Sequence, residues 1–261
     1  LRNKEGERFM ERYAPKIKDL APRDLISRCI VKEIRAGRGI NAKDYVHLDL
    51  THLGKEVLDS KLAEIAGFAR TYAGVNPNEE PIPVVPTCHY MMGGIATDYD
   101  GRVITDENKK PFPGLYAAGE CACVSVHGAN RLGCNSLLDT LVFGRRTGKE
   151  IKSYIDSEKQ PKFAPERVKE ITDPVSGLLA SDGKENPGEI LVELQKTMMD
   201  HVSVFRTKDG LEKAISIIEK LDNRYRNVRL VDQGCCFNRN LLDILELGHM
   251  LDLAKTITLG A

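Results

Sequence analysis

The segment from residue 86 to residue 146 constrains the fold and chemistry of this chain more than any other stretch. It combines a histidine, paired glycines, a short apolar run and a glycine-rich loop that leads into a helical pattern. Open α/β sheets bind ligands beyond the carboxyl ends of their strands, and glycines there let a ligand approach the backbone closely. The segment therefore predicts a ligand site within an α/β domain.

The short apolar run ends at a carboxylate. Residues 114–120, Gly-Leu-Tyr-Ala-Ala-Gly-Glu, follow a proline and are typical of a buried strand. Glu120 would then accept hydrogen bonds from sugar or polyol hydroxyl groups. The alternative is a solvated carboxylate at a strand end, and the spacing alone does not separate the two.

The glycine-rich loop precedes a predicted helix that runs from about residue 135 to residue 154. Ser136 or Asn135 can cap this helix, and Asp139, three residues after Ser136, has the spacing of a capping box. The free N–H groups and positive dipole end of the first turn favour an anionic group, such as a phosphate, a carboxylate or the N1–C2 edge of a reduced flavin. A helix start without a ligand explains the same pattern.

Three motifs in this segment, taken together, resemble the flavoprotein subunits of succinate dehydrogenase and fumarate reductase. They are Pro-Thr-Cys-His-Tyr-Met-Met-Gly-Gly at 86–94, Gly-Glu at 119–120, and His-Gly-Ala-Asn-Arg-Leu-Gly-Cys-Asn-Ser-Leu-Leu at 127–138. The resemblance extends almost end to end, through residues 4–13, 33–39, 47–54 and 203–205.

The resemblance implies roles for five side chains. His89 and Arg131 match positions that bind the substrate dicarboxylate, succinate or fumarate, whereas Glu120, Ser136 and Leu137 match positions that bind FAD. Judged without the family, a lone histidine such as His89 is more often an ordinary core or surface residue. Arginine suits the proposed task because its guanidinium binds a carboxylate through two hydrogen bonds and stays charged.

The resemblance also implies a reaction and partners. We expect an FAD-dependent oxidoreductase that interconverts succinate and fumarate by hydride transfer at the flavin and passes electrons to an iron-sulfur subunit and then to quinone, linking the tricarboxylic acid cycle to electron transport. Membrane anchor subunits would place it on the cytoplasmic face of the inner membrane as a peripheral subunit, or on the matrix side in mitochondria. L-aspartate oxidase is the nearest alternative, but residues 47–54 and 132–134 fit the dehydrogenase better.

The sequence contains no G-x-G-x-x-G fingerprint, which a dinucleotide needs for its pyrophosphate. In the family this fingerprint lies upstream, together with the histidine that commonly carries the flavin covalently, and the proton-donor arginine precedes the segment that matches Leu1. We therefore expect an internal to C-terminal fragment that has no catalytic proton donor and is inactive alone. A folded, non-catalytic module is the alternative from a different class.

Composition narrows the remaining possibilities. Lys plus Arg and Asp plus Glu are equal at 38 each, so no net charge favours a nucleic acid partner. The seven cysteines include no C-x-x-C pair, and we predict no metal site. No apolar run approaches the roughly 18 residues of a membrane span.

Hydrophobic periodicity organises the rest of the chain. Amphipathic patterns predict helices, alternation predicts a strand at 45–51, and prolines predict a linker at 74–86 and a loop-rich stretch at 155–188. The predicted helices lie at residues 23–35, 55–73, 190–205, 211–225 and 241–257.

We predict a mixed α+β and α/β fold on this basis and on the resemblance. Residues 1–80 would be the C-terminal part of a capping domain that closes over the substrate. Residues 81–155 would be the returning segment of an FAD-binding α/β domain. Residues 156–261 would be a loop followed by a truncated helical domain, in which three amphipathic helices pack as a bundle.

Overall fold

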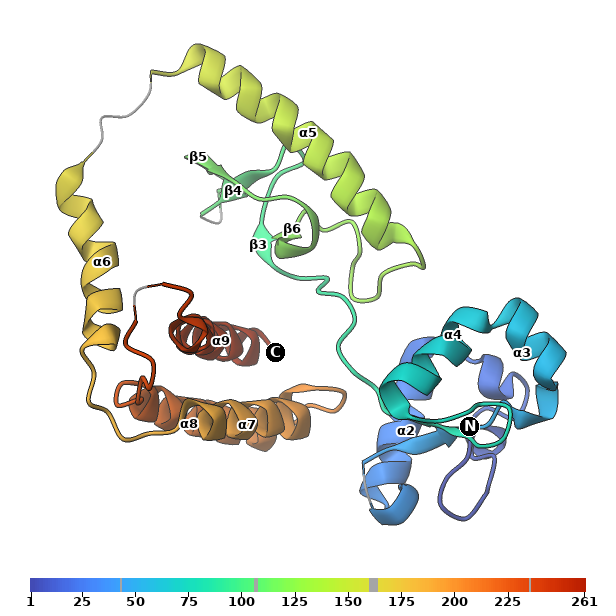
Figure 1. Ribbon diagram of the computed structural model, residues 1–261. Coiled ribbons are helices and arrows are strands. Elements are labelled where there is room, and N and C mark those ends of the chain that lie inside the picture. Colours follow the sequence, from blue (N-terminus) through green and yellow to red (C-terminus); the bar gives the residue numbers. More distant parts are fainter. Residues whose placement is uncertain (43, 106–107, 160–163, 235) are drawn as a thin grey trace. The chain divides into compact units, whose positions relative to one another are not determined.

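The computed structural model describes residues 1–42, 44–105, 108–159, 164–234 and 236–261. It contains helices and short strands in two units (Figure 1). One unit joins Leu1–Pro86 with Pro165–Ala261, and the other is Thr87–Ala164. Among the described residues, no helix combines the length and the apolar character that crossing a bilayer requires.

The N-terminal part of the first unit is built on helix α2 (Arg23–Arg35), which confirms the predicted helix at 23–35. The short helix α1 (Met10–Tyr13) packs against it, and a 3-10 turn at Lys18–Leu20 joins the two. The charged residues of α2 face outward, with the exception of the fully buried Glu33. The apolar core of this part consists of Phe9, Met10, Ala14, Ala21, Cys29, Ile30 and Val46.

A two-stranded antiparallel sheet follows. Strand β1 (Val46–Leu48) confirms the predicted strand in shorter form, and it pairs with β2 (Ile82–Val84). The latter lies inside residues 74–86, so the prediction of an unstructured linker is wrong there. Pro83 occupies the centre of β2 opposite His47. A proline removes one ladder hydrogen bond but is tolerated on an edge strand, and it therefore does not exclude a strand here.

The predicted helix at 55–73 is helical except at Leu62 and is therefore not one continuous helix. It consists of α3 (Lys55–Lys61), α4 (Ala63–Phe68) and a π-helical turn (Ala69–Ala73). The break lies at Leu62, whose φ of −128° is outside the helical range.

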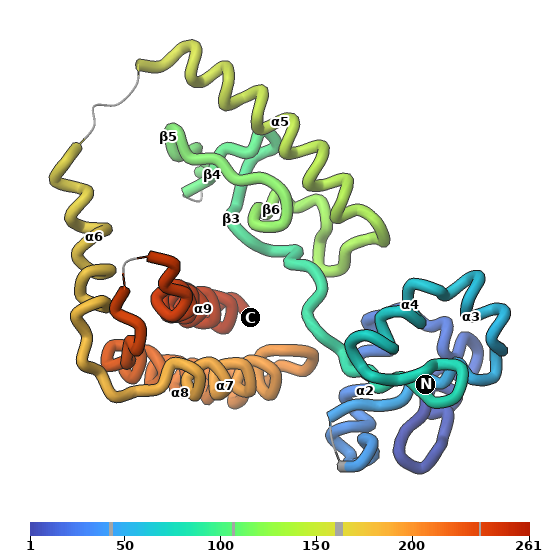
Figure 2. The backbone as a smooth tube through the Cα atoms, in the orientation of Figure 1, coloured from blue at the N-terminus to red at the C-terminus, as the bar shows by residue number. Residues whose placement is uncertain are grey.

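The C-terminal part of the first unit is a helical bundle (Figures 1 and 2). Its helices are α6 (Pro165–Leu179), α7 (Pro187–Thr197), α8 (Lys208–Tyr225) and α9 (Arg239–Gly260), with a π-helical turn at Met198–Val202. The predicted stripes form its core, which confirms that they pack against one another. The core residues are Ile190, Leu194, Ile218, Leu221, Val228, Leu230, Ile244, Leu247, Leu251 and Ala254.

Helix α6 contradicts the predicted loop at 155–188. It begins at Pro165, and a proline is favourable at the first helical position because its missing N–H would be unpaired there anyway. Pro174 lies inside the helix. The prolines predict a loop when they are considered alone, although the segment between them carries a helical apolar pattern.

The second unit contains long helix α5 (Asn135–Ser157), which confirms the predicted helix. Two pairs of strands accompany it: β3 (Ile95–Ala96) runs parallel to β6 (Ala122–Cys123), and β4 (Arg102–Ile104) runs antiparallel to β5 (Pro111–Tyr116). Gly101, at φ +80°, allows the turn before β4 to touch α5, because a Cβ there would collide with Thr147.

The predicted buried strand at 114–120 is wrong in both its bounds and its burial. Strand β5 ends at Tyr116 and is mostly exposed, and Gly119–Cys121 form a 3-10 turn. Within the described residues β5 pairs with β4 alone, so no third strand covers it. Gly114 adopts φ +78° inside the strand rather than in a turn before it.

Candidate functional site

All five residues that the sequence singled out lie in the second unit, around the beginning of α5. His89 is exposed in the loop before β3, and Glu120 is exposed in the 3-10 turn before β6. Arg131 is half-buried in the glycine-rich loop, while Ser136 and Leu137 occupy the first turn of α5. The local structure thus gathers these five residues from three separate segments.

The loop that carries His89 is tied to the turn that carries Glu120. The backbone N–H of Met91 donates to Glu120 Oε1 at 3.1 Å. Gly94, at φ +133°, permits this approach, because a Cβ there would lie 2.5 Å from the carbonyl oxygen of Cys121. In the described part of the chain, no donor meets the other carboxylate oxygen of Glu120, which therefore remains available to a ligand.

Arg131 lies over an aromatic ring rather than against a carboxylate. Its Cζ atom is 4.9 Å from the centre of the Tyr90 ring, and its Nη1 donates to the carbonyl oxygen of Leu132 at 3.0 Å. The Nε atom is buried and has no hydrogen-bond partner among the described residues. A guanidinium with a free, shielded N–H is suited to an anionic ligand.

Three residues that the sequence analysis did not select form a polar cluster beside Arg131. The Tyr90 hydroxyl donates to Asp139 Oδ2 at 2.7 Å, and His127 Nε2 lies 3.1 Å from the same oxygen. Burial and the neighbouring carboxylate raise the pKa of Tyr90 to about 12, further above neutral pH than that of a free phenol. The one signal for this cluster in the sequence was a carboxylate within an otherwise apolar helical stretch.

The capping box predicted for α5 is wrong. The residue before the helix is Cys134, which has the left-handed φ of +65° and makes no side-chain cap. Short-range backbone bonds tighten the entry instead, from Asn135 N–H to Leu132 O and from Leu137 N–H to Cys134 O, both at 3.2 Å. Asp139 is therefore free to turn its carboxylate towards Tyr90 and His127.

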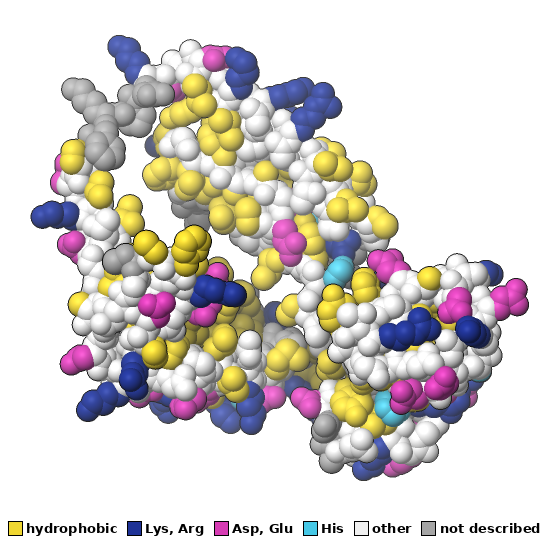
Figure 3. Space-filling view, viewed as in Figure 1, with side chains coloured by type: hydrophobic (Ala, Val, Ile, Leu, Met, Phe, Trp, Pro, Cys, Tyr) yellow, Lys and Arg dark blue, Asp and Glu magenta, His cyan; other side chains and the backbone are white. Residues whose placement is uncertain are grey.

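The helix start also presents apolar side chains to solvent, as Figure 3 shows for this unit. Leu137 is 68% exposed, and Leu138, Leu141 and Val142 are exposed as well. A cavity of about 190 Å³ lies beside them, lined by Val126, His127, Asn135, Leu138, Asp139, Val142 and Phe143. An apolar surface next to unpaired helix amides suits a ligand that is both planar and anionic.

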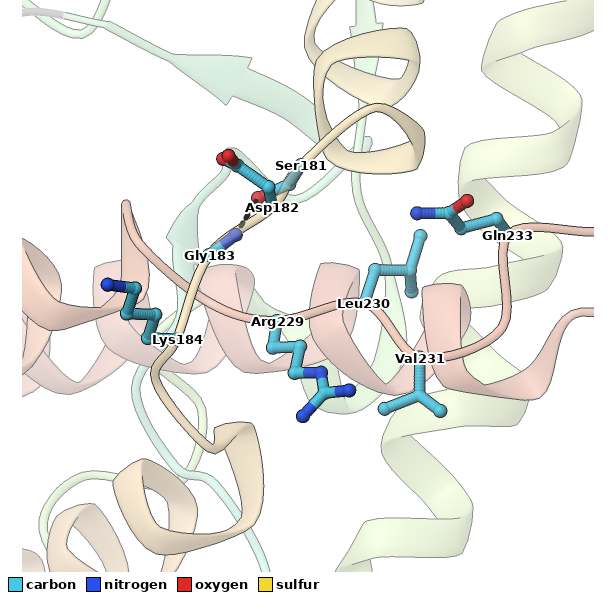
Figure 4. Close-up of a pocket in the computed structure, with 8 residues that line it drawn as sticks. All are labelled: Ser181, Asp182, Gly183, Lys184, Arg229, Leu230, Val231 and Gln233. Carbon is cyan, nitrogen blue, oxygen red and sulfur yellow. Dashed lines mark hydrogen bonds between the residues drawn. The ribbon is translucent and has the colours of Figure 1, made fainter.

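A larger cavity, of about 560 Å³, lies in the first unit and contains none of these residues (Figure 4). It is lined by the segment after α6 and the segment after α8, which are joined by the β-bridge between Asp182 and Arg229. Its lining residues are Ser181, Asp182, Gly183, Lys184, Arg229, Leu230, Val231 and Gln233.

Over the described ranges, no three His, Cys, Asp or Glu side chains are arranged to hold a metal ion.

Comparison with protein families gives the class that this fold and site define. Residues 1–137 match the model of the FAD binding domain, and residues 192–261 match the model of the fumarate reductase flavoprotein C-terminal region. The chain therefore belongs to the FAD-binding domain family, whose model matches just over half of its residues.

Individual relatives specify the family further. The succinate dehydrogenase flavoprotein subunit of Rickettsia conorii is 44% identical over the whole chain, and the mitochondrial subunit of Oryza sativa is 44% identical over 96% of it. The chain belongs to the family of succinate dehydrogenase and fumarate reductase flavoprotein subunits. It spans less than half the length of these relatives, at 45% and 41%.

Solved structures agree with this assignment. A point mutant of the E. coli quinol fumarate reductase FrdA superposes with a TM-score of 0.88 at 35% identity, and the match covers 99% of this chain and 46% of that one. Mycobacterium smegmatis Sdh1 in complex with UQ1 gives 0.83 at 35% identity, covering 99% and 42%. Adenylylsulfate reductase of Archaeoglobus fulgidus, at 18% identity and a TM-score of 0.64, shares the fold alone.

Proposed function

We propose that this chain forms part of an FAD-dependent oxidoreductase that interconverts succinate and fumarate, and that it supplies the dicarboxylate-binding residues His89 and Arg131. The observation that carries the proposal is the buried, unpaired Nε of Arg131 beside the start of α5, within the described part of the chain. The relatives named as succinate dehydrogenase and fumarate reductase flavoprotein subunits supply the substrate class.

In this proposal, Arg131 and His89 bind the dicarboxylate and stabilise the charge that develops on it. The guanidinium of Arg131 carries a permanent positive charge that no described carboxylate neutralises, so it can bind one carboxylate of a dicarboxylate. His89 is exposed in the neighbouring loop, one residue before the ring on which Arg131 lies. Moving a hydride to or from the central carbons shifts charge towards a carboxylate, and fixed cations stabilise that charge more in the transition state than in the ground state.

The residues around α5 fit FAD, which supplies the two-electron chemistry when it is bound. The first-turn amides at Ser136 offer donors to an anionic edge, and the 68% exposed side chain of Leu137 offers an apolar contact. Among the described residues, Glu120 keeps one carboxylate oxygen free for hydroxyl groups of the cofactor. In this proposal, the pyrophosphate of FAD is bound by a segment that carries the G-x-G-x-x-G fingerprint. This sequence lacks that fingerprint.

The proposal extends to partners and organisation. Electrons would pass to an iron-sulfur subunit and then to quinone, in a complex with membrane anchor subunits on the cytoplasmic face of the inner membrane or the mitochondrial matrix side. Residues 1–80 would belong to the capping domain, 81–155 to the FAD domain and 156–261 to the helical domain. The names of relatives that mention ubiquinone or quinol support the electron partner.

The proposed function is tested by dye-linked oxidation in the assembled flavoenzyme. Succinate should reduce an artificial electron acceptor, whereas L-aspartate should not. Faster dye reduction with L-aspartate than with succinate would replace the proposal with the sibling oxidase. In parallel, the 261-residue chain is mixed with excess FAD, and a bound flavin absorption band would refute the view that its FAD site is incomplete.

Replacement of Glu120 by alanine is expected to weaken FAD binding rather than substrate binding. A hydrogen bond to a charged group is worth about 1.5–3 kcal/mol, which corresponds to a roughly 10- to 150-fold loss of FAD affinity. The measurement is the flavin content of the purified flavoenzyme, followed by titration with FAD. Glu150→Gln, on the same unit but paired with Arg102 at 3.7 Å, is the control. A Glu120→Ala enzyme with full flavin content and unchanged affinity would remove Glu120 from the cofactor site.

A further inference from the structure

Asp139 is a buried carboxylate that the proposed reaction does not use. Its side chain is 4% exposed and that of His127 is 8% exposed. One oxygen, Oδ2, receives both the Tyr90 hydroxyl and the His127 Nε2, at 2.7 and 3.1 Å. Burying a carboxylate costs free energy unless its hydrogen bonds are satisfied, so Tyr90 and His127 are held in contact with Asp139 Oδ2.

The ring of Tyr90 is held in place by two independent contacts. Its hydroxyl is anchored to Asp139, and its ring meets the His127 ring edge to face, with centres 5.5 Å apart and planes at 87°. The Tyr90 hydroxyl is a neutral donor at pH 7, and burial together with the Asp139 carboxylate raises its pKa further, to about 12. The hydroxyl bond to Asp139 and the ring contact with His127 therefore fix the orientation of the Tyr90 ring together.

The fixed ring carries the Arg131 guanidinium on its face, 4.9 Å from the ring centre. The face of an aromatic ring attracts a guanidinium cation without accepting hydrogen bonds from its N–H donors as a carboxylate does. A carboxylate partner would occupy those donors and neutralise the charge. The ring contact and the bond from Nη1 to the Leu132 carbonyl oxygen hold Arg131 in place, and no carboxylate among the described residues occupies its other donors.

We propose that Tyr90 is a positioning residue for Arg131, and that Asp139 and His127 orient Tyr90 for this purpose. The ring presents the guanidinium to one carboxylate of the substrate without competing for it. This inference rests on the proposed function, because it assigns Tyr90 a role in the dicarboxylate site. Its structural half, the dependence of Arg131 on the Tyr90 ring, is independent of that function.

The same unit offers a matched control. Arg146 lies over the ring of Tyr99 at 4.6 Å, but its Nε also donates to Asp100 Oδ1 at 2.8 Å. Arg146 is thus held by a carboxylate as well as by a ring. Removing the Tyr99 ring should leave Arg146 near its place, whereas removing the Tyr90 ring should leave Arg131 held only by the bond from its Nη1 to the Leu132 carbonyl oxygen, a weaker restraint than the Asp100 ion pair.

The first experiment is NMR on the 261-residue chain with ¹⁵N-labelled arginine. Arg131 Nε–H should be shifted upfield by the Tyr90 ring current in the unmodified chain, should keep part of this shift in Tyr90→Phe, which loses the bond to Asp139, and should lose it in Tyr90→Leu. Tyr99→Leu should not affect it. A second measurement uses the unmodified chain alone: nuclear Overhauser contacts are expected between the Arg131 δ protons and the Tyr90 ring. Absence of these contacts, or an unchanged Arg131 signal in Tyr90→Leu, overturns the proposal.

The second experiment measures succinate kinetics in the assembled flavoenzyme. A cation–π contact contributes about 0.5–2 kcal/mol, so Tyr90→Leu should raise KM roughly 2- to 30-fold. Tyr90→Phe keeps the ring and its contact with His127 but loses the bond to Asp139, so its KM should lie between the original value and that of Tyr90→Leu. Tyr99→Leu should leave KM unchanged. If the Arg131 signal moves in Tyr90→Leu but KM does not, the positioning stands and the assignment of Arg131 to the substrate falls. An equal rise of KM in Tyr90→Phe would overturn the role of the ring.

Discussion

An Arg131→Lys flavoenzyme is expected to oxidise succinate about 10²- to 10³-fold more slowly while keeping its flavin. This is the loss that typically follows removal of one fixed donor that stabilises transition-state charge. Lysine preserves the positive charge but not the planar pair of donors, and its ammonium cannot stack on Tyr90 as a flat cation does. Steady-state turnover with an artificial electron acceptor, together with flavin absorbance, measures both quantities.

The control for this variant is Arg146→Lys on helix α5. Arg146 makes a comparable ring contact with Tyr99 but pairs with Asp100, and it is outside the gathered residues around the helix start. We expect its turnover to stay within about twofold of the original, as for a surface ion pair. Near-normal turnover in Arg131→Lys would exclude Arg131 from the substrate site. Loss of flavin instead would place Arg131 in the cofactor site.

Replacement of Glu33 by alanine is expected to cost about 1.5–3 kcal/mol of unfolding free energy in the first unit, because it removes charged hydrogen bonds and leaves the buried Asn3 amide without one of its acceptors. Glu33 is 0% exposed. Arg38 donates to it through Nε at 2.7 Å and Nη2 at 2.8 Å, and Arg12 through Nη2 at 2.9 Å. The Tyr13 hydroxyl and the Asn3 amide complete the set, at 2.7 and 3.0 Å.

Thermal unfolding followed by circular dichroism measures this loss. Glu11→Ala is the matched control, because Glu11 lies on α1 in the same part of the chain but pairs with Arg8 and Lys18 at the surface. It should cost less than about 1 kcal/mol. A Glu33→Ala chain as stable as Glu11→Ala would show that the network contributes specificity of packing but no net stability.

The same carboxylate predicts an acid dependence of stability. Hydrogen bonds from Arg38 and the other donors hold the pKa of Glu33 well below its usual range. Because the folded pKa lies below the unfolded value of about 4.3, the contribution is present above that pH and is lost as pH falls towards the folded pKa. The original chain should therefore lose more stability between neutral and acid pH than Glu33→Gln does. Parallel losses would contradict the assignment.

Much of the secondary structure follows from local patterns. Helices α2, α5 and α8 appear where apolar residues recur at helical spacing, since an amphipathic stripe specifies both the helix and its buried face. Strand β2 and helix α6 do not follow from local patterns, because the prolines in their segments predict breaks. Pro83 is accepted in a short two-stranded ladder and Pro165 at a helix start, and both outcomes depend on position rather than on residue type.

The sequence by itself determined the family resemblance, the motifs around the glycine-rich loop and the five candidate residues, because these are contiguous signals. Only the tertiary structure decided what surrounds Arg131. Tyr90 and Asp139 are 49 residues apart in the chain, and their hydrogen bond exists because the loop before β3 folds back onto α5. The spacing of Asp139 suggested a helix cap, but a left-handed Cys134 tightened the entry and released that carboxylate to hold Tyr90. Contacts between distant segments depend on where the backbone brings them, and no local pattern encodes that.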